Sequence, residues 1–321
     1  MRIAVVGAGG VGGYFGGRLA LAGEQVHLLA RGAHLAAIRE RGLRVRSVAG
    51  DFEVAVPATD DPAEVGPCDY VLFCVKSYDT EEAAATLPAL IADGTAVISL
   101  QNGVDNEEKL VRAIGPGHVL GGVTFIYATI AEPGLILQSG GPRQIVIGEM
   151  DGSKSERAEG LAAACRAAGI DATATDEIHW LLWDKLALIC AHAGMTAGVR
   201  LSIGEIREVP EAMDAFRRIV EEVRAVAAAE EVDLGADVVD RHEAFSRSLE
   251  PDSFSSLHYD LTHGRRMELE ALHGEVVRRA RSHGMRVPVC ETVYALLRPW
   301  AVRNEGAAGA GGGGGGGDGA A

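Results

Sequence analysis

The sequence predicts an α/β protein in which a doubly wound, mostly parallel sheet is followed by an all-helical domain. The chain has 321 residues, more than a single hydrophobic core usually organises. Its first half alternates short apolar runs with amphipathic stretches, the order typical of helices that cover a parallel sheet. After about Ser155 the strand-like runs disappear, and helical periodicity with charged faces takes over.

The predicted sheet begins with four apolar runs that have the length and composition of buried strands. They are rich in Val, Ile and Leu and are mostly bounded by glycine or polar residues. These runs are residues 3–6, 25–29, 70–75 and 96–100, and the helical patterns between them cover residues 11–22, 33–41 and 106–114. Strand-like runs also occur at 120–126, 135–138 and 145–148, separated by Pro133-Gly134 and by residues 140–142. We expect these three to form a more antiparallel edge of the sheet.

The second half predicts helices, for example over residues 212–230 and 267–283. We place the domain boundary near residue 170, which gives a first domain of residues 1–170 and a helical domain of residues 171–304. Residues 305–321 are almost entirely Gly and Ala. Such a segment buries too little apolar surface to offset its ordering entropy, so we predict a disordered tail.

Charge and composition exclude several classes of function. The formal net charge of −15 argues against nucleic acid as a partner, because phosphates require clustered Lys and Arg. The apolar runs are too short to span a bilayer, and the amino terminus carries no cleavable signal pattern, so we expect a soluble, cytoplasmic protein. The five cysteines are scattered without a CxxC or Cys/His cluster, which favours neither disulfides nor a metal site.

A glycine-rich turn after the first strand predicts a dinucleotide site. Residues 7–12 match G-x-G-x-x-G directly between an apolar strand and an amphipathic helix, as in Rossmann-type domains. Gly7 would permit the tight turn, Gly9 would let the pyrophosphate approach the backbone, and Gly12 would allow close packing of helix and strand. Gly10 and Val11 open the helix, whose amino terminus attracts phosphate.

The end of the second strand indicates which dinucleotide binds. An NAD site has an acidic residue there for the ribose 2′-hydroxyl, but this segment ends without a carboxylate. Arg31 lies where a guanidinium could pair with a 2′-phosphate. We therefore predict NADPH as the cofactor.

Two further strands end in polar residues at the carboxyl edge of the sheet, where open α/β sheets bind their ligands. Lys76 follows the strand at 70–75, and Asn102 follows the strand at 96–100.

In the second half, Lys185 lies on a predicted helix beside Trp183 and Leu186, in surroundings that can prepare an ammonium for acid chemistry. Glu268 and Ser256 flank the start of a late helix.

Taken together and in order, these motifs resemble the ketopantoate reductase (2-dehydropantoate 2-reductase) family over essentially residues 1–300. Besides the glycine turn with Arg31, the shared landmarks are Cys-Val-Lys ending at Lys76, Gln-Asn-Gly at Asn102, Ala128 before Glu132-Pro133-Gly134, Trp-x-Lys-Leu at Lys185, Ser-Ser at Ser256, and Met-Glu-Leu at Glu268 running on to Gly274.

The resemblance implies a role for each of these residues. Lys185 would be the general acid, with Glu268 as its partner. Asn102, Ser256 and Lys185 would hold the substrate. Lys76 and Ala128 would lie along the cofactor, with Asn102 and Glu268 also in reach of it. An ammonium stabilises the negative charge that hydride transfer builds on a ketone oxygen and then donates a proton.

One departure from the family pattern concerns the substrate pocket. The family typically has asparagines four and eight positions after the lysine, whereas this chain has Ile189 and Ala193. On a helix both share a face with Lys185, as does His192. We expect His192 either to supply part of the missing polar contact or to pack against a neighbouring helix, and Ile189 to favour an apolar substrate tail.

The expected function is NADPH-dependent reduction of a 2-oxo acid, most simply ketopantoate to pantoate in pantothenate biosynthesis. Two alternatives remain open: a paralogous reductase of a more apolar 2-oxo acid, and an NADPH-binding sensor without catalysis. Retention of Lys185 and Glu268 argues against the sensor. The oligomeric state is open as well, with a homodimer as one candidate.

Overall fold

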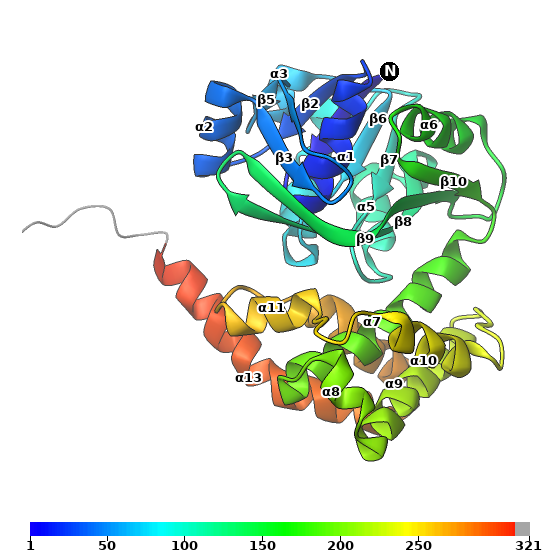
Figure 1. Ribbon diagram of the computed structural model, residues 1–321. Coiled ribbons are helices and arrows are strands. Elements are labelled where there is room, and N and C mark those ends of the chain that lie inside the picture. Colours follow the sequence, from blue (N-terminus) through cyan, green and yellow to red (C-terminus); the bar gives the residue numbers. More distant parts are fainter. Residues whose placement is uncertain (312–321) are drawn as a thin grey trace, which may run out of the picture. The chain divides into compact units, whose positions relative to one another are not determined.

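The computed structural model describes residues 1–311, and the side chains of residues 1–306. The chain divides into two compact units, Met1–Leu182 and Trp183–Ala321. The first contains the sheet and its covering helices, and the second is helical (Figure 1). The predicted fold class, a doubly wound sheet followed by an all-helical domain, is confirmed.

The first unit is built on one ten-stranded sheet with the order β4-β3-β9-β8-β7-β6-β1-β2-β5, and β10 pairs with β9 beside this path. The four predicted strands are present and form parallel pairs: β1 (Arg2–Val6), β2 (Gln25–Leu29), β6 (Tyr70–Phe73) and β7 (Ala96–Ser99). The other strands are β3 (Leu43–Ser47), β4 (Phe52–Val54), β5 (Ala58–Thr59), β8 (Val119–Glu132), β9 (Leu135–Glu149) and β10 (Asp171–Thr175).

Helices cover both faces of the sheet, as doubly wound topology requires. Strand β1 shows the alternation: Ile3 and Val5 belong to one buried cluster, and Ala4 and Val6 belong to the other. Side chains of α1 (Gly10–Leu21) and α6 (Glu156–Ala167) complete the first cluster. The second is completed by α3 (Pro62–Val65), α4 (Thr80–Ala84) and α5 (Asn106–Ile114). Helix α2 (Gly32–Arg41) follows β2.

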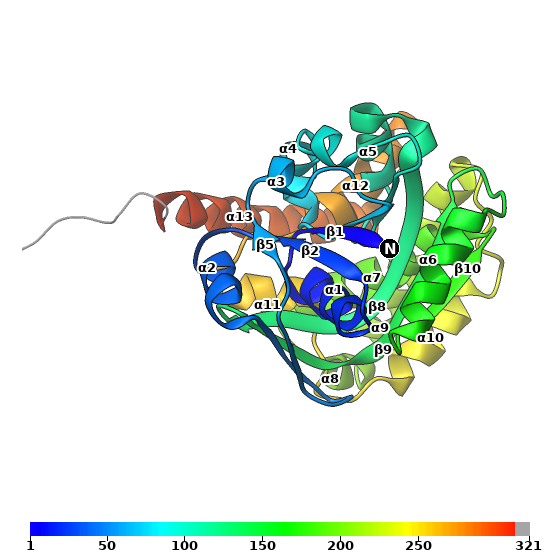
Figure 2. The same ribbon diagram turned by 90° about the horizontal axis from the view of Figure 1, so that it is seen from above.

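Helix α1 lies unusually close to the sheet because glycines form its inner face. A Cβ added at Gly12 would lie 2.3 Å from the Gly7 carbonyl oxygen, and one at Gly16 would lie 2.8 Å from Cγ2 of Val5. The long strands β8 and β9 curve past the same helix (Figure 2). This packing holds the amino terminus of α1 at the carboxyl end of β1.

The β8–β9 region differs from the prediction in two respects. The pair is antiparallel, as expected, but β3 and β4 lie beyond it, so it is not the edge of the sheet. The runs at 135–138 and 145–148 belong to one continuous strand, β9. Gly141 and Arg143 have positive φ angles, and the pairing with β8 shifts register there, so residues 140–142 form an irregularity within the strand.

The domain boundary and the tail also differ from the prediction. The division falls between Leu182 and Trp183, later than residue 170, because β10 pairs with β9 and completes the sheet of the first unit. Strand β10 also shows that strands continue beyond Ser155. The predicted disordered tail begins inside α13 (Pro288–Gly311), which is helical to Gly311, and residues 312–321 lie outside the described residues.

The second unit contains the helix predicted at 212–230. The helix predicted at 267–283 begins only at Glu270, with a π-helical turn over Glu270–Gly274, and continues as α12 (Glu275–Ser282). The helices of the second unit are α7 (Ile178–Val199, which begins in the first unit), α8 (Ile203–Arg207), α9 (Pro210–Ala229), α10 (Val238–Ser248), α11 (Ser256–Thr262), α12 and α13. Helix α9 contributes Phe216, Ile219 and Val223 to the core of this unit. Within residues 1–311, no helix combines the length and apolar character that a membrane span requires.

Gly12→Ala tests the close packing of α1. The added methyl group would meet a backbone oxygen, so we expect a loss of about 1–3 kcal/mol in the free energy of unfolding, as for other overpacked interiors. Gly94→Ala is the control, because its Cβ would meet nothing within 4 Å and its backbone is unstrained. Thermal unfolding followed by circular dichroism measures both variants. Equal melting temperatures would contradict the packing argument.

Candidate active site

The glycine-rich turn has the geometry that a dinucleotide pyrophosphate needs. Gly7 adopts a φ of +95°, a conformation that favours glycine, and the N–H groups of Gly7 and Ala8 donate to the Leu29 carbonyl at 3.2 and 3.0 Å. A Cβ at Gly9 would meet nothing within 4 Å, so the backbone is open on that side. Gly12 has no room for a side chain against the turn. Gly7 and Gly12 thus show the turn and the close contact that the glycine pattern predicts, and the binding of a cofactor by this turn stays a prediction.

The amino terminus of α1 is free to receive an anion. Its N-cap is Gly9, no side chain caps it, and its first turn, which includes Gly10 and Val11, carries no acidic residue. A Cβ at Gly10 would lie 2.1 Å from the carbonyl oxygen of Ala128, so β8 passes directly beside this turn. The structure therefore brings Ala128 to the glycine loop, although the two are far apart in sequence. These residues fit the pyrophosphate of a dinucleotide.

Arg31 is the N-cap residue of α2, directly after β2. Its Nη1 atom donates to Oε1 of Glu82 on α4 at 2.9 Å, and both side chains are 68% exposed. Exposed ion pairs of this kind contribute little free energy in water, so a phosphate group can replace the Glu82 carboxylate as the partner of Arg31. No motif in the sequence singles out Glu82, because only the fold places α4 beside the end of β2.

Lys76 and Asn102 follow the carboxyl ends of neighbouring strands, as predicted. Lys76 is exposed and caps the 3₁₀ turn Ser77–Asp79 after β6, and Asn102 is half-buried after β7. Parallel pairing of β6 with β7 brings the two loops to the same edge of the sheet.

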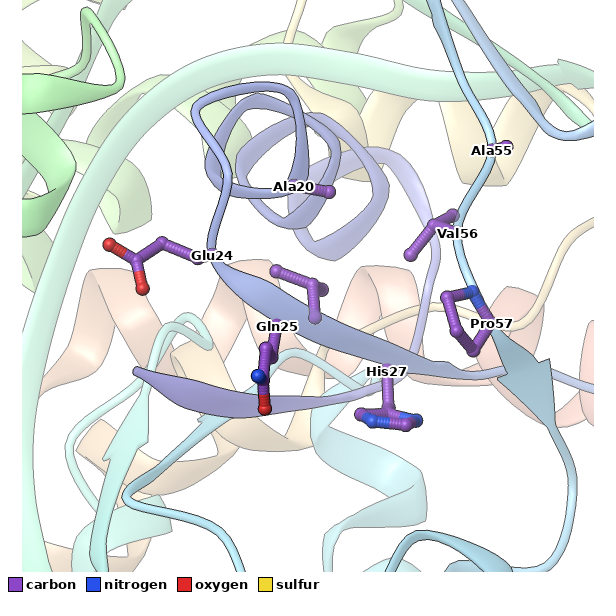
Figure 3. Close-up of a pocket in the computed structure, with 8 residues that line it drawn as sticks. Ala20, Glu24, Gln25, His27, Ala55, Val56 and Pro57 are labelled. Carbon is purple, nitrogen blue, oxygen red and sulfur yellow. The ribbon is translucent and has the colours of Figure 1, made fainter.

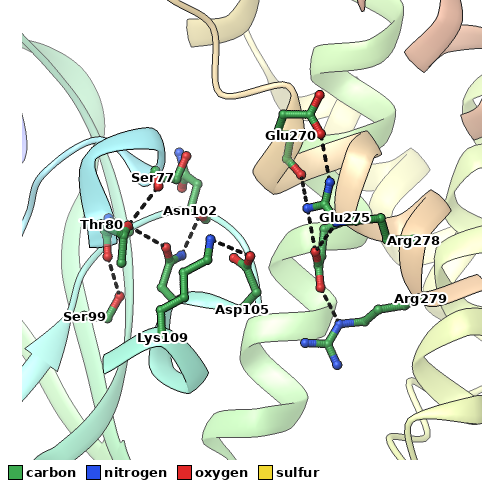
Figure 4. Close-up of polar contacts among 12 residues, drawn as sticks. Ser77, Thr80, Ser99, Asn102, Asp105, Lys109, Glu270, Glu275, Arg278 and Arg279 are labelled. Atoms are coloured by element: carbon green, nitrogen blue, oxygen red, sulfur yellow. Dashed lines mark hydrogen bonds and ion pairs between the residues drawn. The ribbon is translucent and has the colours of Figure 1, made fainter. Parts of the chain in front are cut away.

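A buried polar network supports these two loops (Figure 4). Gln101 Nε2 donates to the Val75 carbonyl at 2.9 Å and to Thr80 Oγ1 at 2.8 Å. Asn106 Nδ2 donates to the Asn102 carbonyl at 2.9 Å. Buried, satisfied networks hold backbone in one arrangement. In the sequence, this network is indicated by the adjacent amide side chains of Gln101 and Asn102 and by Asn106, one helical turn later.

Glu107, next to this network, is a buried carboxyl group that the sequence did not single out. Burial raises its pKa to about 7, and the nearby charge of Asp105 acts in the same direction, while a hydrogen bond with Ser99 opposes the shift. Asp105 in turn pairs with Lys109 Nζ at 2.6 Å. The carboxyl group of Glu107 therefore loses its proton at a higher pH than an exposed glutamate, in α5, the helix that follows the loop of Asn102.

Helix α7 carries the catalytic lysine predicted for the second unit. Lys185 is only 8% exposed, Ile189 is half-buried, and Ala193 is buried. The neighbouring Asp184 is paired with α10, its Oδ1 atom lying 3.0 Å from Arg241 Nη1 and 3.2 Å from His242 Nε2. Burial alone would raise the pKa of Asp184, but these two partners hold it below its usual value. Asp184 is thus a structural anchor for the helix.

His192 lies on the same helix and is 9% exposed. Neither ring nitrogen has a closely placed hydrogen-bond partner among the described residues, although the Phe254 backbone interacts with the ring and favours its protonated form. Burial is the main reason that its pKa falls to about 4, so the imidazole is neutral at pH 7. A neutral imidazole can donate one hydrogen bond and accept another.

Ser256 is the exposed first residue of α11, and hydroxyl groups attach this helix to α7. Thr196 Oγ1 donates to the His192 carbonyl at 2.8 Å, and the hydroxyl groups of Thr196 and Ser255 are hydrogen-bonded to each other at 2.8 Å. Ser255 Oγ accepts the His258 N–H at 3.0 Å and so caps α11. This chain of bonds sets the position of Ser256 relative to the helix of Lys185.

Glu268 is buried just before the π-helical turn. Within that turn His273 packs on α7, because a Cβ at Gly194 would lie 2.5 Å from His273 Nε2. Glu275, at the start of α12, accepts from Arg278 at 2.7 Å and from Arg279 at 2.6 Å (Figure 4). Isolated π-turns are frequent at functional sites. The segment of Glu268 is therefore held against the helix of Lys185.

A surface hollow of about 230 Å³ lies elsewhere on the first unit (Figure 3). It is formed by the end of α1, the start of β2 and the segment before β5, with the lining residues Ala20, Glu24, Gln25, Val26, His27, Ala55, Val56 and Pro57. None of the predicted site residues lines it, and we do not assign it a ligand.

Both units of the chain match known proteins. The family model described as Ketopantoate reductase PanE/ApbA matches residues 3–152, and its C-terminal counterpart matches residues 177–301. A 2-dehydropantoate 2-reductase of Halobacterium salinarum is 36% identical over 301 residues, which is 93% of this chain and 98% of the relative. The crystal structure of a PanE/ApbA family ketopantoate reductase from Ralstonia eutropha JMP134 has a TM-score of 0.87 at 37% identity and covers 95% of this chain and 100% of that chain.

A further structural neighbour, D-mandelate dehydrogenase with NADH and anilino(oxo)acetate, has a TM-score of 0.88 at 23% identity and covers 95% of this chain and 99% of that chain. This likeness concerns the fold alone. The two family matches, by contrast, cover both units, and relatives above 30% identity match nearly the whole length. The chain belongs to the ketopantoate reductase family.

Proposed function

We propose that the protein reduces ketopantoate (2-dehydropantoate) to pantoate with NADPH, a step of pantothenate biosynthesis. The main support is that the chain combines an open glycine turn with a buried lysine on α7. Both of its units also match ketopantoate reductases. The named relatives support this substrate over a more apolar 2-oxo acid and over a sensor without catalysis.

The first unit would hold the cofactor. The glycine turn and the amino terminus of α1 would bind the pyrophosphate, and Ala128 and Lys76 would lie along the molecule. Arg31 would leave Glu82 and pair with the 2′-phosphate, which favours NADPH over NADH. Bound NADPH would supply a hydride to the ketone carbon.

Lys185 would act on the oxygen of the same ketone. Its ammonium would stabilise the negative charge that develops there and then give up a proton to form the hydroxyl group of the product. The burial of Lys185 supports this role, because electrostatic stabilisation is stronger where water is excluded. Glu268 would be its carboxylate partner, and the packing of the π-turn on α7 supports that assignment.

Asn102 and Ser256 would hydrogen-bond the substrate. Ile189 and Ala193 stand where the family typically has asparagines, so they would offer apolar contact. His192 would supply a polar contact in their place, which the burial of its neutral ring on the face of Lys185 supports. The alternative, that His192 only packs between helices, predicts no effect of its removal on substrate affinity.

The substrate assignment is tested by following NADPH oxidation with ketopantoate, 2-oxoisovalerate and phenylglyoxylate. We expect the highest kcat/KM for ketopantoate, at about 10⁴ M⁻¹s⁻¹ or above, the lower end of ordinary enzyme efficiency. His192→Phe should raise the KM for ketopantoate about 2- to 10-fold, as for the loss of one hydrogen bond. His179→Phe, an exposed change on the same helix, is the control. A clear preference for phenylglyoxylate would reject ketopantoate as the substrate.

Cofactor choice is tested by Arg31→Ala. Loss of a charged hydrogen bond to the 2′-phosphate should weaken NADPH about 10- to 100-fold and leave NADH nearly unchanged. Arg41→Ala removes an exposed arginine at the other end of α2 and should change neither affinity. Fluorescence titration of both nucleotides gives the dissociation constants. Equal use of NADH and NADPH by the wild type would contradict the assignment of NADPH as the preferred cofactor.

Lys185→Ala should lower turnover by about 10²- to 10⁴-fold, the usual contribution of a positioned general acid, while NADPH affinity stays near normal. Lys154→Ala, an exposed lysine paired with Asp176, is the control for loss of a lysine. Single-turnover measurements isolate the chemical step. A Lys185 variant that keeps more than about a third of wild-type turnover would show that another group supplies the proton.

A further inference from the structure

His34, on α2, connects two segments of the first unit that are far apart in sequence. Its Nε2 atom lies 2.8 Å from the carbonyl oxygen of Ala8 in the glycine turn. Its Nδ1 atom lies 3.1 Å from the backbone nitrogen of Gly134, in the turn between β8 and β9. The Gly134 N–H can only donate, so Nδ1 is the acceptor and Nε2 carries the hydrogen that is donated to Ala8. Both bonds require this one neutral tautomer.

The surroundings of His34 favour the neutral ring. Burial is the main influence, and it lowers the pKa of His34 below the usual value of 6.5, although the bond to Ala8 acts in the opposite direction. The imidazole is therefore neutral at pH 7, and Nδ1 keeps the lone pair that accepts from Gly134.

The bond to Ala8 determines where the next N–H points. The peptide between Ala8 and Gly9 is trans and planar, so its C=O and N–H groups point in opposite directions. With the Ala8 carbonyl directed at His34, the Gly9 N–H is directed away from α2. The preceding N–H groups, those of Gly7 and Ala8, are already bonded to Leu29, whereas a Cβ added at Gly9 would meet nothing within 4 Å.

The second partner of His34 is itself fixed. The Gly134 carbonyl accepts the Arg44 N–H at 2.9 Å, and a Cβ at Gly134 would lie 2.9 Å from Cβ of Ala37 on α2. The same hairpin carries Ala128, which lies against Gly10 at the other side of the glycine turn. His34 thus ties the glycine turn to the hairpin that borders it.

We infer that His34 is a positioning residue for the cofactor: by holding the Ala8 carbonyl, it orients the Gly9 N–H toward the pyrophosphate of NADPH. The inference rests on the proposed function, because it needs a dinucleotide at the glycine turn. His34 does not touch the reacting atoms, so its effect falls on NADPH affinity and leaves the chemical step unchanged.

The test compares His34→Leu, which removes both bonds, with His34→Gln, whose amide can donate to one partner and accept from the other. NADPH dissociation constants are measured by fluorescence titration, together with the KM for ketopantoate and kcat at saturating NADPH. We expect His34→Leu to weaken NADPH about 3- to 10-fold, with kcat and the ketopantoate KM within about twofold of the wild type. His34→Gln should recover most of the affinity.

His118→Leu is the matched control, since His118 is also half-buried in the first unit and its Nδ1 atom lies 2.9 Å from the Thr95 carbonyl. It should not change NADPH affinity. If His34→Leu does not fold, His34→Asn, which is polar but too short to reach both partners, replaces it. Unchanged NADPH affinity in a folded variant, or a loss that glutamine does not recover, would overturn the inference. A wild type that does not bind NADPH would instead overturn the proposed function and the inference with it.

Discussion

The close contact between α1 and the sheet is the constraint on which the rest of the first unit depends. Gly12 and Gly16 leave no room for a side chain between the helix and β1, and Gly10 leaves none between the helix and β8. Because the backbone itself is in contact, the amino terminus of α1 has little freedom to shift relative to the carboxyl end of β1. Its unpaired N–H groups and positive dipole end are thereby placed where a pyrophosphate can reach them. Arg31, His34 and Ala128 are then grouped around that terminus by β2, α2 and β8.

In the second unit, side-chain contacts hold helix α7 in place, where close backbone packing holds α1 in the first unit. Helix α7 carries Lys185, and three sets of contacts hold it: the ion pairs of Asp184 with α10, the Thr196–Ser255 hydroxyl bond to α11, and the packing of His273 on Gly194. Buried polar groups that are satisfied in this way favour one arrangement over its alternatives. His192 is less well satisfied, because neither ring nitrogen has a close hydrogen-bond partner among the described residues, although the Phe254 backbone interacts with the ring. In a well-satisfied setting such a group is a reasonable candidate for contact with a ligand.

The substitution of the expected asparagines by Ile189 and Ala193 does not alter the family to which the chain belongs. Relatives named 2-dehydropantoate 2-reductase match nearly the whole length of the chain. The departure is confined to one face of α7, whereas the glycine turn, Lys185 and Glu268 are retained. Substrate specificity depends on a few contacts around the substrate. It can therefore change while the fold stays the same. Under the proposed function, the change would concern how the substrate is held.

Local patterns in the sequence were sufficient for the strand–helix order, the glycine turn, the position of Arg31 after β2, and the helix that carries Lys185. Each of these depends on residues within a few positions of one another, through periodicity or backbone conformation. The tertiary structure alone decided that β3 and β4 extend the sheet beyond β9, that β10 belongs to the first unit, and that residues 140–142 stay within a strand. It also decided that Glu82 faces Arg31 across 51 residues of chain and that His34 bonds to Gly134 across 100. Contacts of this kind leave no periodic or local signal, because they exist only once the sheet has brought distant segments together.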